Sequence, residues 1–194
     1  MKEYQVKVHD TRTEWFQKGQ HHREDGPAVE YANGDKYWYL NGQLHREYGP
    51  AVDWANGDKE WYLDGERHRE DGPAVERANG DKFWWLNGQL HHLDGPAVEY
   101  ANGSKEWYLN GQRHREDGPA VKRVDGGKFW YLKGQLHRLD GPAVERANGD
   151  KFWYLNDKSL SESKFNARMN PTELTLDEIA KKFGIPVEQL KIKK

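Results

Sequence analysis

The chain has 194 residues, of which 35% are hydrophobic, and its mean hydropathy is −1.15. This composition excludes a deep aliphatic core, whereas nine Trp, ten Tyr and six Phe are more than a disordered chain carries. The formal net charge is −2 and the charges are well mixed, which argues against duplex nucleic acid or an anionic membrane as a partner.

The chain contains no cysteine, so disulfides and zinc sites built on thiolates are excluded. Its first ten residues lack the apolar stretch of a secretory signal, and no segment is long and apolar enough to predict a membrane span. We therefore expect a cytoplasmic protein that makes no membrane contact.

An exact 23-residue repeat follows a short predicted edge strand, residues 4–8, in which lysine discourages pairing with another chain. Gly-Pro-Ala-Val occurs six times without an insertion between copies. A tryptophan keeps the same spacing seven times, at Trp15, Trp38, Trp61, Trp84, Trp107, Trp130 and Trp153. Such regular self-similarity predicts a repeat array.

Each unit predicts two antiparallel strands. In the second unit, residues 36–40 form an aromatic strand, and Asn41-Gly42 is the strongest short signal for a hairpin turn. The return strand covers residues 43–54 and should bulge or kink at its Gly-Pro, because proline donates no ladder hydrogen bond. The predicted fold is mainly β: an elongated single-layer antiparallel meander of seven hairpin repeats over residues 1–157.

The alternation of side chains along a strand assigns the faces of this sheet. One face should carry Trp38, Leu40, Gln43 and His45, and the other Tyr37, Tyr39, Leu44 and Arg46. The copies support the assignment, because the position of Tyr37 holds Glu wherever that of Leu44 holds Arg or His. These sites are diagonal neighbours, so we expect ion pairs at Glu14–His21, Glu60–Arg67 and Glu106–Arg113.

After Trp153 the pattern changes, and residues 158–194 predict a short helical cap for the open end of the array. Residues 160–169 predict one helix. Thr175 and Glu178 fit a capping box, Gly184 a helix stop, and Pro186 the first turn of a further helix. Residues 176–190 also resemble half of a helix-turn-helix and the middle of a LysM carbohydrate-binding module.

The unit resembles a MORN repeat, and more closely the MORN-variant repeats of antitoxin-like bacterial proteins and phage proteins. The resemblance covers about residues 13–157 and lies in Tyr39-Leu-Asn-Gly42, in His45 and in Gly26–Gly34. It implies a single-layer meander of hairpins, and it suggests neutralisation of a toxin or a bacterial defence protein in the cytoplasm of a bacterial host. A MORN repeat has glycine where this chain has Glu60 or Arg46, so lipid contact is not expected.

Catalysis is not expected, because the units hold almost no Ser or Thr, and their carboxylates recur nearly unchanged instead of forming one asymmetric constellation. We expect no cofactor and no metal. The histidine column, represented by His45, has neighbours about 10 Å apart, too far to share one ion. These histidines are expected to have a structural role, packed on Trp38 and its equivalents and hydrogen-bonded across the strands.

Binding is better supported, because a single-layer sheet leaves aromatic side chains partly exposed. The tyrosine column and its flanking arginines form the candidate surface, together with Trp54 and His92, which depart from the consensus; Tyr48 and Leu93 depart from it too. The candidate residues are Tyr39, Tyr62, Trp85, Tyr108, Tyr131, Trp54, His92, Arg46, Arg69 and Arg115. We expect a protein partner; the alternatives are a carbohydrate or nucleotide bound by the aromatic and arginine columns, and a structural spacer or oligomer component.

Overall fold

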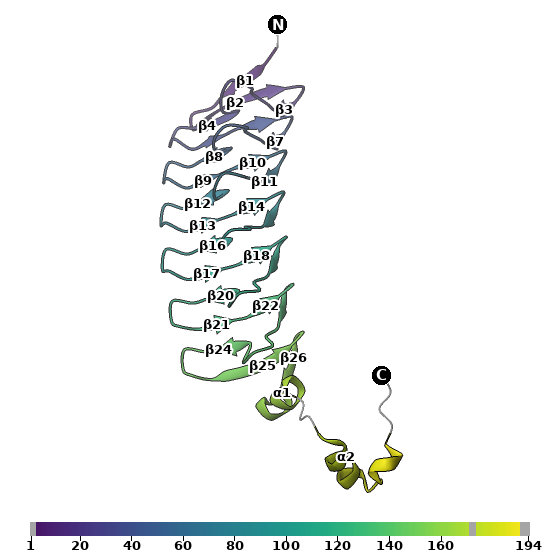
Figure 1. Ribbon diagram of the computed structural model, residues 1–194. Coiled ribbons are helices and arrows are strands. Elements are labelled where there is room, and N and C mark those ends of the chain that lie inside the picture. The colour runs from purple at the N-terminus through teal and green to yellow at the C-terminus, as the bar shows by residue number, and fades with distance from the viewer. Residues whose placement is uncertain (1–2, 171–173, 191–194) are drawn as a thin grey trace.

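The computed structural model describes residues 3–170 and 174–190; the remaining positions of the predicted array and cap lie outside the described residues. Figure 1 shows a ladder of short strands that ascends from the C-terminal helices to the N-terminus. The predicted fold is confirmed, since the chain is mainly β and its long sheet is an antiparallel meander.

The long sheet follows the chain from one end of the array to the other, in the order β1-β2-β4-β5-β8-β9-β12-β13-β16-β17-β20-β21-β24-β25-β26. Its central strands are short and form the spine of the ladder: β4 (Val29–Tyr31), β5 (Lys36–Tyr37), β8 (Val52–Asp53), β9 (Lys59–Glu60), β12 (Val75–Glu76), β13 (Lys82–Phe83), β16 (Val98–Glu99), β17 (Lys105–Glu106), β20 (Val121–Lys122), β21 (Lys128–Phe129) and β24 (Val144–Glu145).

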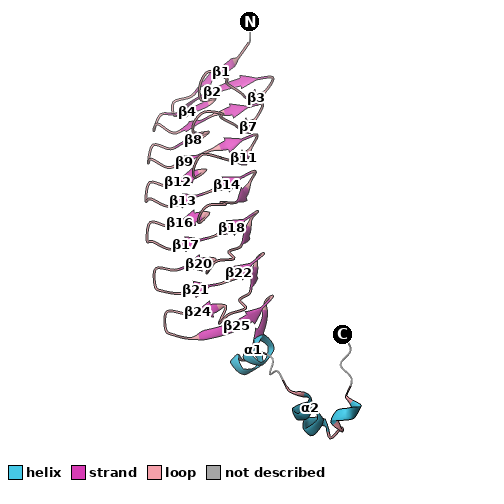
Figure 2. Ribbon diagram, in the orientation of Figure 1, coloured by secondary structure: helices cyan, strands magenta, loops and turns pink. Residues whose placement is uncertain are grey.

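Beside this spine, each complete unit projects a two-stranded hairpin (Figure 2). The hairpins are β6 (Tyr39–Leu40) with β7 (Gln43–Leu44), β10 (Tyr62–Leu63) with β11 (Glu66–Arg67), β14 (Trp85–Leu86) with β15 (Gln89–Leu90), β18 (Tyr108–Leu109) with β19 (Gln112–Arg113), and β22 (Tyr131–Leu132) with β23 (Gln135–Leu136). Tyr39 pairs with Leu44 and Leu40 with Gln43, as the Asn-Gly turn predicts.

The expected interruption at Gly-Pro is a loop inserted opposite each tryptophan. Trp38 donates its N–H to the Ala51 carbonyl and accepts from the His45 N–H, so the five residues 46–50 are looped out of the return strand. We call the six equivalent segments the bulge loops: residues 23–27, 46–50, 69–73, 92–96, 115–119 and 138–142. They divide each predicted return strand in two.

Two kinds of turn connect the strands. Asn41 and Gly42 both have positive φ, of 50° and 79°, which is the backbone of a two-residue type I′ turn. At the opposite edge Gly34 donates to the Tyr31 carbonyl, and Tyr31 donates to that of Asp35, which describes a three-residue loop with Gly34 in the left-handed region. Both turns recur along the chain and fix the register of every unit.

The core is a thin double column of small side chains along the spine. The alanines of Gly-Pro-Ala-Val, such as Ala51 and Ala74, are fully buried, and the adjacent valines are at most 8% exposed. Because neighbours in a strand point to opposite faces, alanine fills the space beneath the bulge loops and valine packs on the other face. No large side chain in the described residues is fully buried, in agreement with the low hydrophobicity.

The two ends are closed differently. At the N-terminal end, β1 (Gln5–Val8) is the predicted edge strand and pairs with β2 (Arg12–Gln17), which also pairs with β3 (Gln20–His21). At the other end, β25 (Lys151–Leu155) and β26 (Lys158–Leu160) keep a hairpin turn although Asp157 replaces glycine, with φ of 60°.

Helix α1 (Glu162–Met169) adjoins β25 and buries Phe165, so it covers the last strands as the predicted cap should (Figure 1). Helix α2 (Leu176–Phe183) has the predicted capping box and ends at Gly184 in the left-handed region. The predicted helix after Pro186 is a single 3-10 turn, η1 (Val187–Gln189), which packs on α2.

Candidate functional site

The sheet has two chemically different faces. Val52 is paired with Tyr37 on one side and Glu60 on the other, and paired residues project to the same face. We call this the tyrosine face, because the tyrosine column continues it on the hairpins. The predicted pairing is confirmed there: Arg67 and Arg113 lie 2.9 and 3.0 Å from the carboxylates of Glu60 and Glu106, and His21 is hydrogen-bonded to Glu14 at 2.9 Å.

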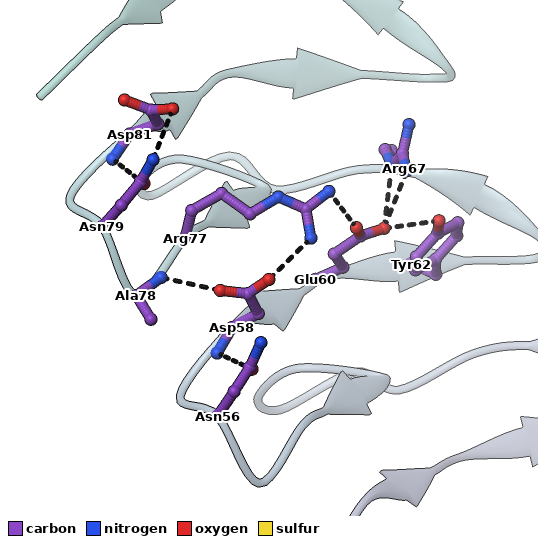
Figure 3. A network of polar contacts seen from close by, with 9 residues as sticks. All are labelled: Asn56, Asp58, Glu60, Tyr62, Arg67, Arg77, Ala78, Asn79 and Asp81. Carbon is purple, nitrogen blue, oxygen red and sulfur yellow. Dashed lines mark hydrogen bonds and ion pairs between the residues drawn. The ribbon is translucent and has the colours of Figure 1, made fainter.

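Glu60 is the centre of a buried polar cluster on the tyrosine face (Figure 3). Its side chain is 3% exposed, and its Oε2 accepts from Arg67 at 2.9 Å and from the Tyr62 hydroxyl at 2.7 Å. Its Oε1 lies 2.8 Å from Nη2 of Arg77, whose Nη1 is 3.2 Å from Asp58. Burial, together with the hydrogen bond to Glu60, raises the pKa of Tyr62 to about 12.

The tyrosine column that we expected to bind a partner is partly occupied by the protein's own arginines. The guanidinium of Arg67 lies 5.7 Å from the ring centroid of Tyr62 and 5.4 Å from that of Trp85. Two units further on, Arg113 bridges Tyr108 and Tyr131 at 5.7 and 5.5 Å. Each ring of the column, Tyr39 included, is half-buried. The column therefore contributes packing between repeats as well as surface.

Trp54 also belongs to the tyrosine face. Its ring is half-buried and meets Tyr37 edge-on, with centroids 6.3 Å apart, while the Arg77 guanidinium lies 5.6 Å from its centroid. Trp54 thus contacts the Glu60 cluster from the preceding unit. The sequence identified Trp54 as a departure from the consensus and as a candidate binding residue, but not its contact with Arg77.

The prediction that Arg46 shares a face with Tyr39 was wrong. Arg46 lies flat over Trp38, 4.0 Å from its ring centroid, and donates through Nη1 to the Pro50 carbonyl at 3.1 Å. Arg69 and Arg115 stack in the same way on Trp61 and Trp107, both at 4.1 Å. The reason is that the bulge loop leaves the strand after His45, so strict alternation no longer applies.

His92 takes the arginine's place in the fourth bulge loop. Its ring stacks on Trp84 with centroids 5.0 Å apart and an interplanar angle of 7°, and its Nδ1 lies 2.9 Å from the Pro96 carbonyl. The structure therefore separates the predicted binding residues. Tyr39, Trp54 and the tyrosine column are on one face, whereas the arginines and His92 are on the other, which we call the tryptophan face.

Consecutive bulge loops enclose grooves on the tryptophan face, each with a half-buried tryptophan at its base. The grooves over Trp38, Trp61, Trp107 and Trp130 have volumes of about 560, 840, 290 and 710 Å³. Their rims are carboxylates such as Asp71, which is 83% exposed and whose pKa is lowered by its hydrogen bond from Arg69. The rims form an acidic ridge along the array.

Three large apolar side chains interrupt this acidic ridge. Tyr48 is 85% exposed, Leu93 77% and Leu139 61%, and each stands where other units carry a solvated Asp or Glu. The sequence indicated Tyr48 and Leu93 as departures from the consensus. It did not single out Leu139, although alignment of the units would have shown that leucine replaces Glu24 and its equivalents there.

The histidine column joins each repeat to the next through hydrogen bonds. Nδ1 of His45 accepts the backbone N–H of Asp64, in the following hairpin turn, at 3.1 Å. The same bond recurs along the array, and the turn residues that donate the backbone N–H to the histidine of the preceding unit are Asn41, Asp64, Asn87, Asn110, Lys133 and Asn156. Across residues 3–170 and 174–190, no three His, Cys, Asp or Glu side chains gather to hold a metal ion.

None of the helices in the described part of the chain has the length and apolarity needed to cross a bilayer. A scan of protein-family models found none that matches the chain, and no curated protein matches it either.

Proposed function

We propose that the protein is a non-catalytic repeat scaffold that binds a protein partner through the acidic ridge of its bulge loops. The observation that carries this proposal is the exposure of Tyr48, Leu93 and Leu139 on that ridge. Exposed apolar side chains with a polar rim are typical of protein interfaces. In each case the equivalent position of another unit holds a carboxylate, so the fold itself does not need an apolar residue there.

The partner's chemistry follows from the surroundings of these three side chains. Asp25, Asp71, Asp117 and Asp140 repeat along the ridge and are about four-fifths exposed. A surface with apolar side chains and flanking basic groups would complement this ridge. Covering a surface of a toxin or a bacterial defence protein would neutralise it, which is the role suggested by the resemblance to MORN-variant repeats.

The grooves favour a protein partner over a carbohydrate. A sugar bound by tryptophan needs an open ring face, but Arg46 and its equivalents lie over the tryptophans at about 4 Å. A flat protein surface needs no access to these rings and can rest on the loop tips.

The test is a variant that restores the repeat consensus, combining Tyr48→Asp, Leu93→Glu and Leu139→Glu. These residues occur at the same positions of other units, so the variant should keep the fold. The wild-type protein should retain a partner from a lysate of its source cells in a fixed ratio, and the variant should lose at least about nine-tenths of it because the apolar anchors are gone.

The matched control is Val124→Ala, which also restores the consensus at an exposed apolar position but lies in a turn at the opposite edge of the spine. It should retain the partner. Equal capture by the triple variant and the wild type would contradict the proposal. Tryptophan fluorescence that responds to oligosaccharides or nucleotides, with no protein retained, would favour the carbohydrate or nucleotide alternative instead.

A further inference from the structure

A cavity of about 380 Å³ opens on the tyrosine face beside Glu106. It lies two repeats, or 46 residues, beyond the Glu60 cluster, and its wall is built from equivalent positions. Tyr100 corresponds to Trp54, Ser104 to Asp58, Glu106 to Glu60, Arg113 to Arg67 and Arg123 to Arg77. The two sites are therefore two copies of one arrangement, of which the first is filled.

In the filled copy, an arginine of the protein occupies the space. The guanidinium of Arg77 lies 2.8 Å from Oε1 of Glu60 and 3.2 Å from Asp58, against the ring of Trp54. This copy shows how the arrangement holds a guanidinium: one carboxylate oxygen faces it, a second acid fixes it, and an aromatic ring forms the wall.

In the open copy, the equivalent arginine, Arg123, lines the cavity but is not bonded to Glu106. Ser104 still accepts the backbone N–H of Val124, as Asp58 accepts that of Ala78, but it offers no carboxylate to hold a guanidinium. Arg123 instead points toward Asp125, with Nε 4.0 Å from Oδ2. Its side chain lies over Gly127, where an added Cβ would come within 3.3 Å of Arg123 Cδ.

The remaining features of the arrangement are intact. Oε2 of Glu106 accepts from Arg113 at 3.0 Å and from the Tyr108 hydroxyl at 2.8 Å, as in the filled copy. Oε1 of Glu106 has no hydrogen-bond or ion-pair partner among residues 3–170 and 174–190, whereas the equivalent oxygen of Glu60 is bound by Arg77. Tyr100 and Phe129 supply aromatic walls.

We propose that this cavity binds a guanidinium group, such as the side chain of an arginine, which takes the place that Arg77 occupies in the other copy. One face of the group packs on Tyr100, and its N–H groups donate to Oε1 of Glu106. An anion is disfavoured at Oε1 of Glu106, because it would face that carboxylate. Of the two arginines in the cavity wall, Arg113 directs Nε and Nη2 at Glu106, and Arg123 lies beside Asp125. The site is on the tyrosine face and does not depend on the proposed function.

The experiment is an isothermal titration with N-acetyl-L-arginine amide, compared with N-acetyl-L-citrulline amide, which has nearly the same shape but no charge. The arginine compound should bind at one site and the citrulline compound should not. Glu106→Gln should weaken binding at least about tenfold, since it removes the charge that faces the guanidinium. Glu116→Gln, the same change in an exposed bulge-loop residue, should leave binding unaltered.

A gain of function completes the test. Arg77→Ala empties the filled copy, so the number of binding sites should rise from one to two. Ser104→Asp should have the opposite effect, because it restores the acid that holds the arginine in the filled copy and lets Arg123 occupy the cavity. Circular dichroism checks that each variant is folded.

Equal binding of the two compounds, unchanged affinity in Glu106→Gln, or binding of N-acetyl-L-aspartate amide in their place would overturn the proposal. Free L-arginine and an arginine-containing peptide distinguish the two sources of the group: tighter binding of the free amino acid indicates a small-molecule ligand, and tighter binding of the peptide indicates a segment of a protein. The variant that combines Tyr48→Asp, Leu93→Glu and Leu139→Glu should give the same titration results as the wild type, whether or not it still captures a protein partner.

Discussion

Arg46 covers Trp38 with its guanidinium 4.0 Å from the ring centroid, and the same side chain closes its bulge loop by donating to the Pro50 carbonyl. Arg46→Ala removes both contacts and should destabilise the protein by about 1–2 kcal/mol. Arg46→Lys keeps the charge but loses the flat stack, so it should recover only part of the loss. Urea unfolding measures both, and an alanine variant as stable as the wild type would show that the stack contributes nothing.

The Glu60 cluster should respond to mutation as a unit. Glu60→Phe leaves the half-buried Arg67 and Arg77 without their carboxylate and should cost about 2 kcal/mol, less than the loss of a fully buried ion pair because water reaches both arginines. Adding Arg67→Leu recreates the aromatic–leucine pair of the neighbouring units and should recover part of this cost. A double-mutant cycle in urea tests the coupling. Strictly additive changes in the free energy of unfolding would show that Glu60 and Arg67 do not act as a unit.

Alkaline pH should weaken the same cluster and its second copy. Burial, together with the hydrogen bonds to Glu60 and Glu106, raises the pKa of Tyr62 and of Tyr108 to about 12 from 10.0. Because the pKa of each tyrosine is higher in the folded than in the unfolded state, the stability that the protonated hydroxyls contribute is complete below pH 10 and is lost as the pH rises toward 12. Melting temperatures between pH 9 and 12 should fall less steeply in Tyr62→Phe with Tyr108→Phe than in the wild type. Parallel curves of melting temperature against pH for the double variant and the wild type would show that the two tyrosine hydroxyls do not cause the alkaline loss of stability.

The modularity of the array predicts tolerance of a whole-unit deletion. Removing residues 82–104, which form one 23-residue repeat, brings equivalent positions together and should leave a folded, shorter ladder with the same far-ultraviolet spectrum per residue. Removing 12 residues from the same place breaks the register of strands and loops and should abolish cooperative unfolding. A folded 12-residue deletion would contradict the register described by the turns.

The sequence predicted the fold well because its signals are local. Asn41-Gly42 sets the hairpin register. Along the array, Glu at the position of Glu60 occurs together with Arg or His at the position of Arg67, and this covariation correctly identified the two positions as being in contact. The position of Arg46 was predicted wrongly, because alternation counts faces only along an unbroken strand and residues 46–50 leave it.

The candidate sites depend on longer-range geometry. Arg77 reaches Glu60 across the spine, and nothing in the spacing alone says that Arg123 is not bonded to Glu106 in the same way. A signal was present nevertheless, since Ser104 and Gly127 break the consensus on either side of Arg123. Glu recurs every second repeat up to Glu106, so the informative comparison is between positions 46 residues apart. Comparing the surroundings of Glu60 and Glu106 in this way would have shown that Ser104 replaces Asp58 beside the cavity.

The most direct test of the acidic ridge as the binding surface is hydrogen–deuterium exchange of the protein with and without its captured partner. We expect slower exchange in the complex at residues 46–50, 92–96 and 138–142, the bulge loops that carry Tyr48, Leu93 and Leu139. Protection confined to the turns at the opposite edge, such as residues 31–35, with unchanged exchange in the bulge loops, would contradict the account.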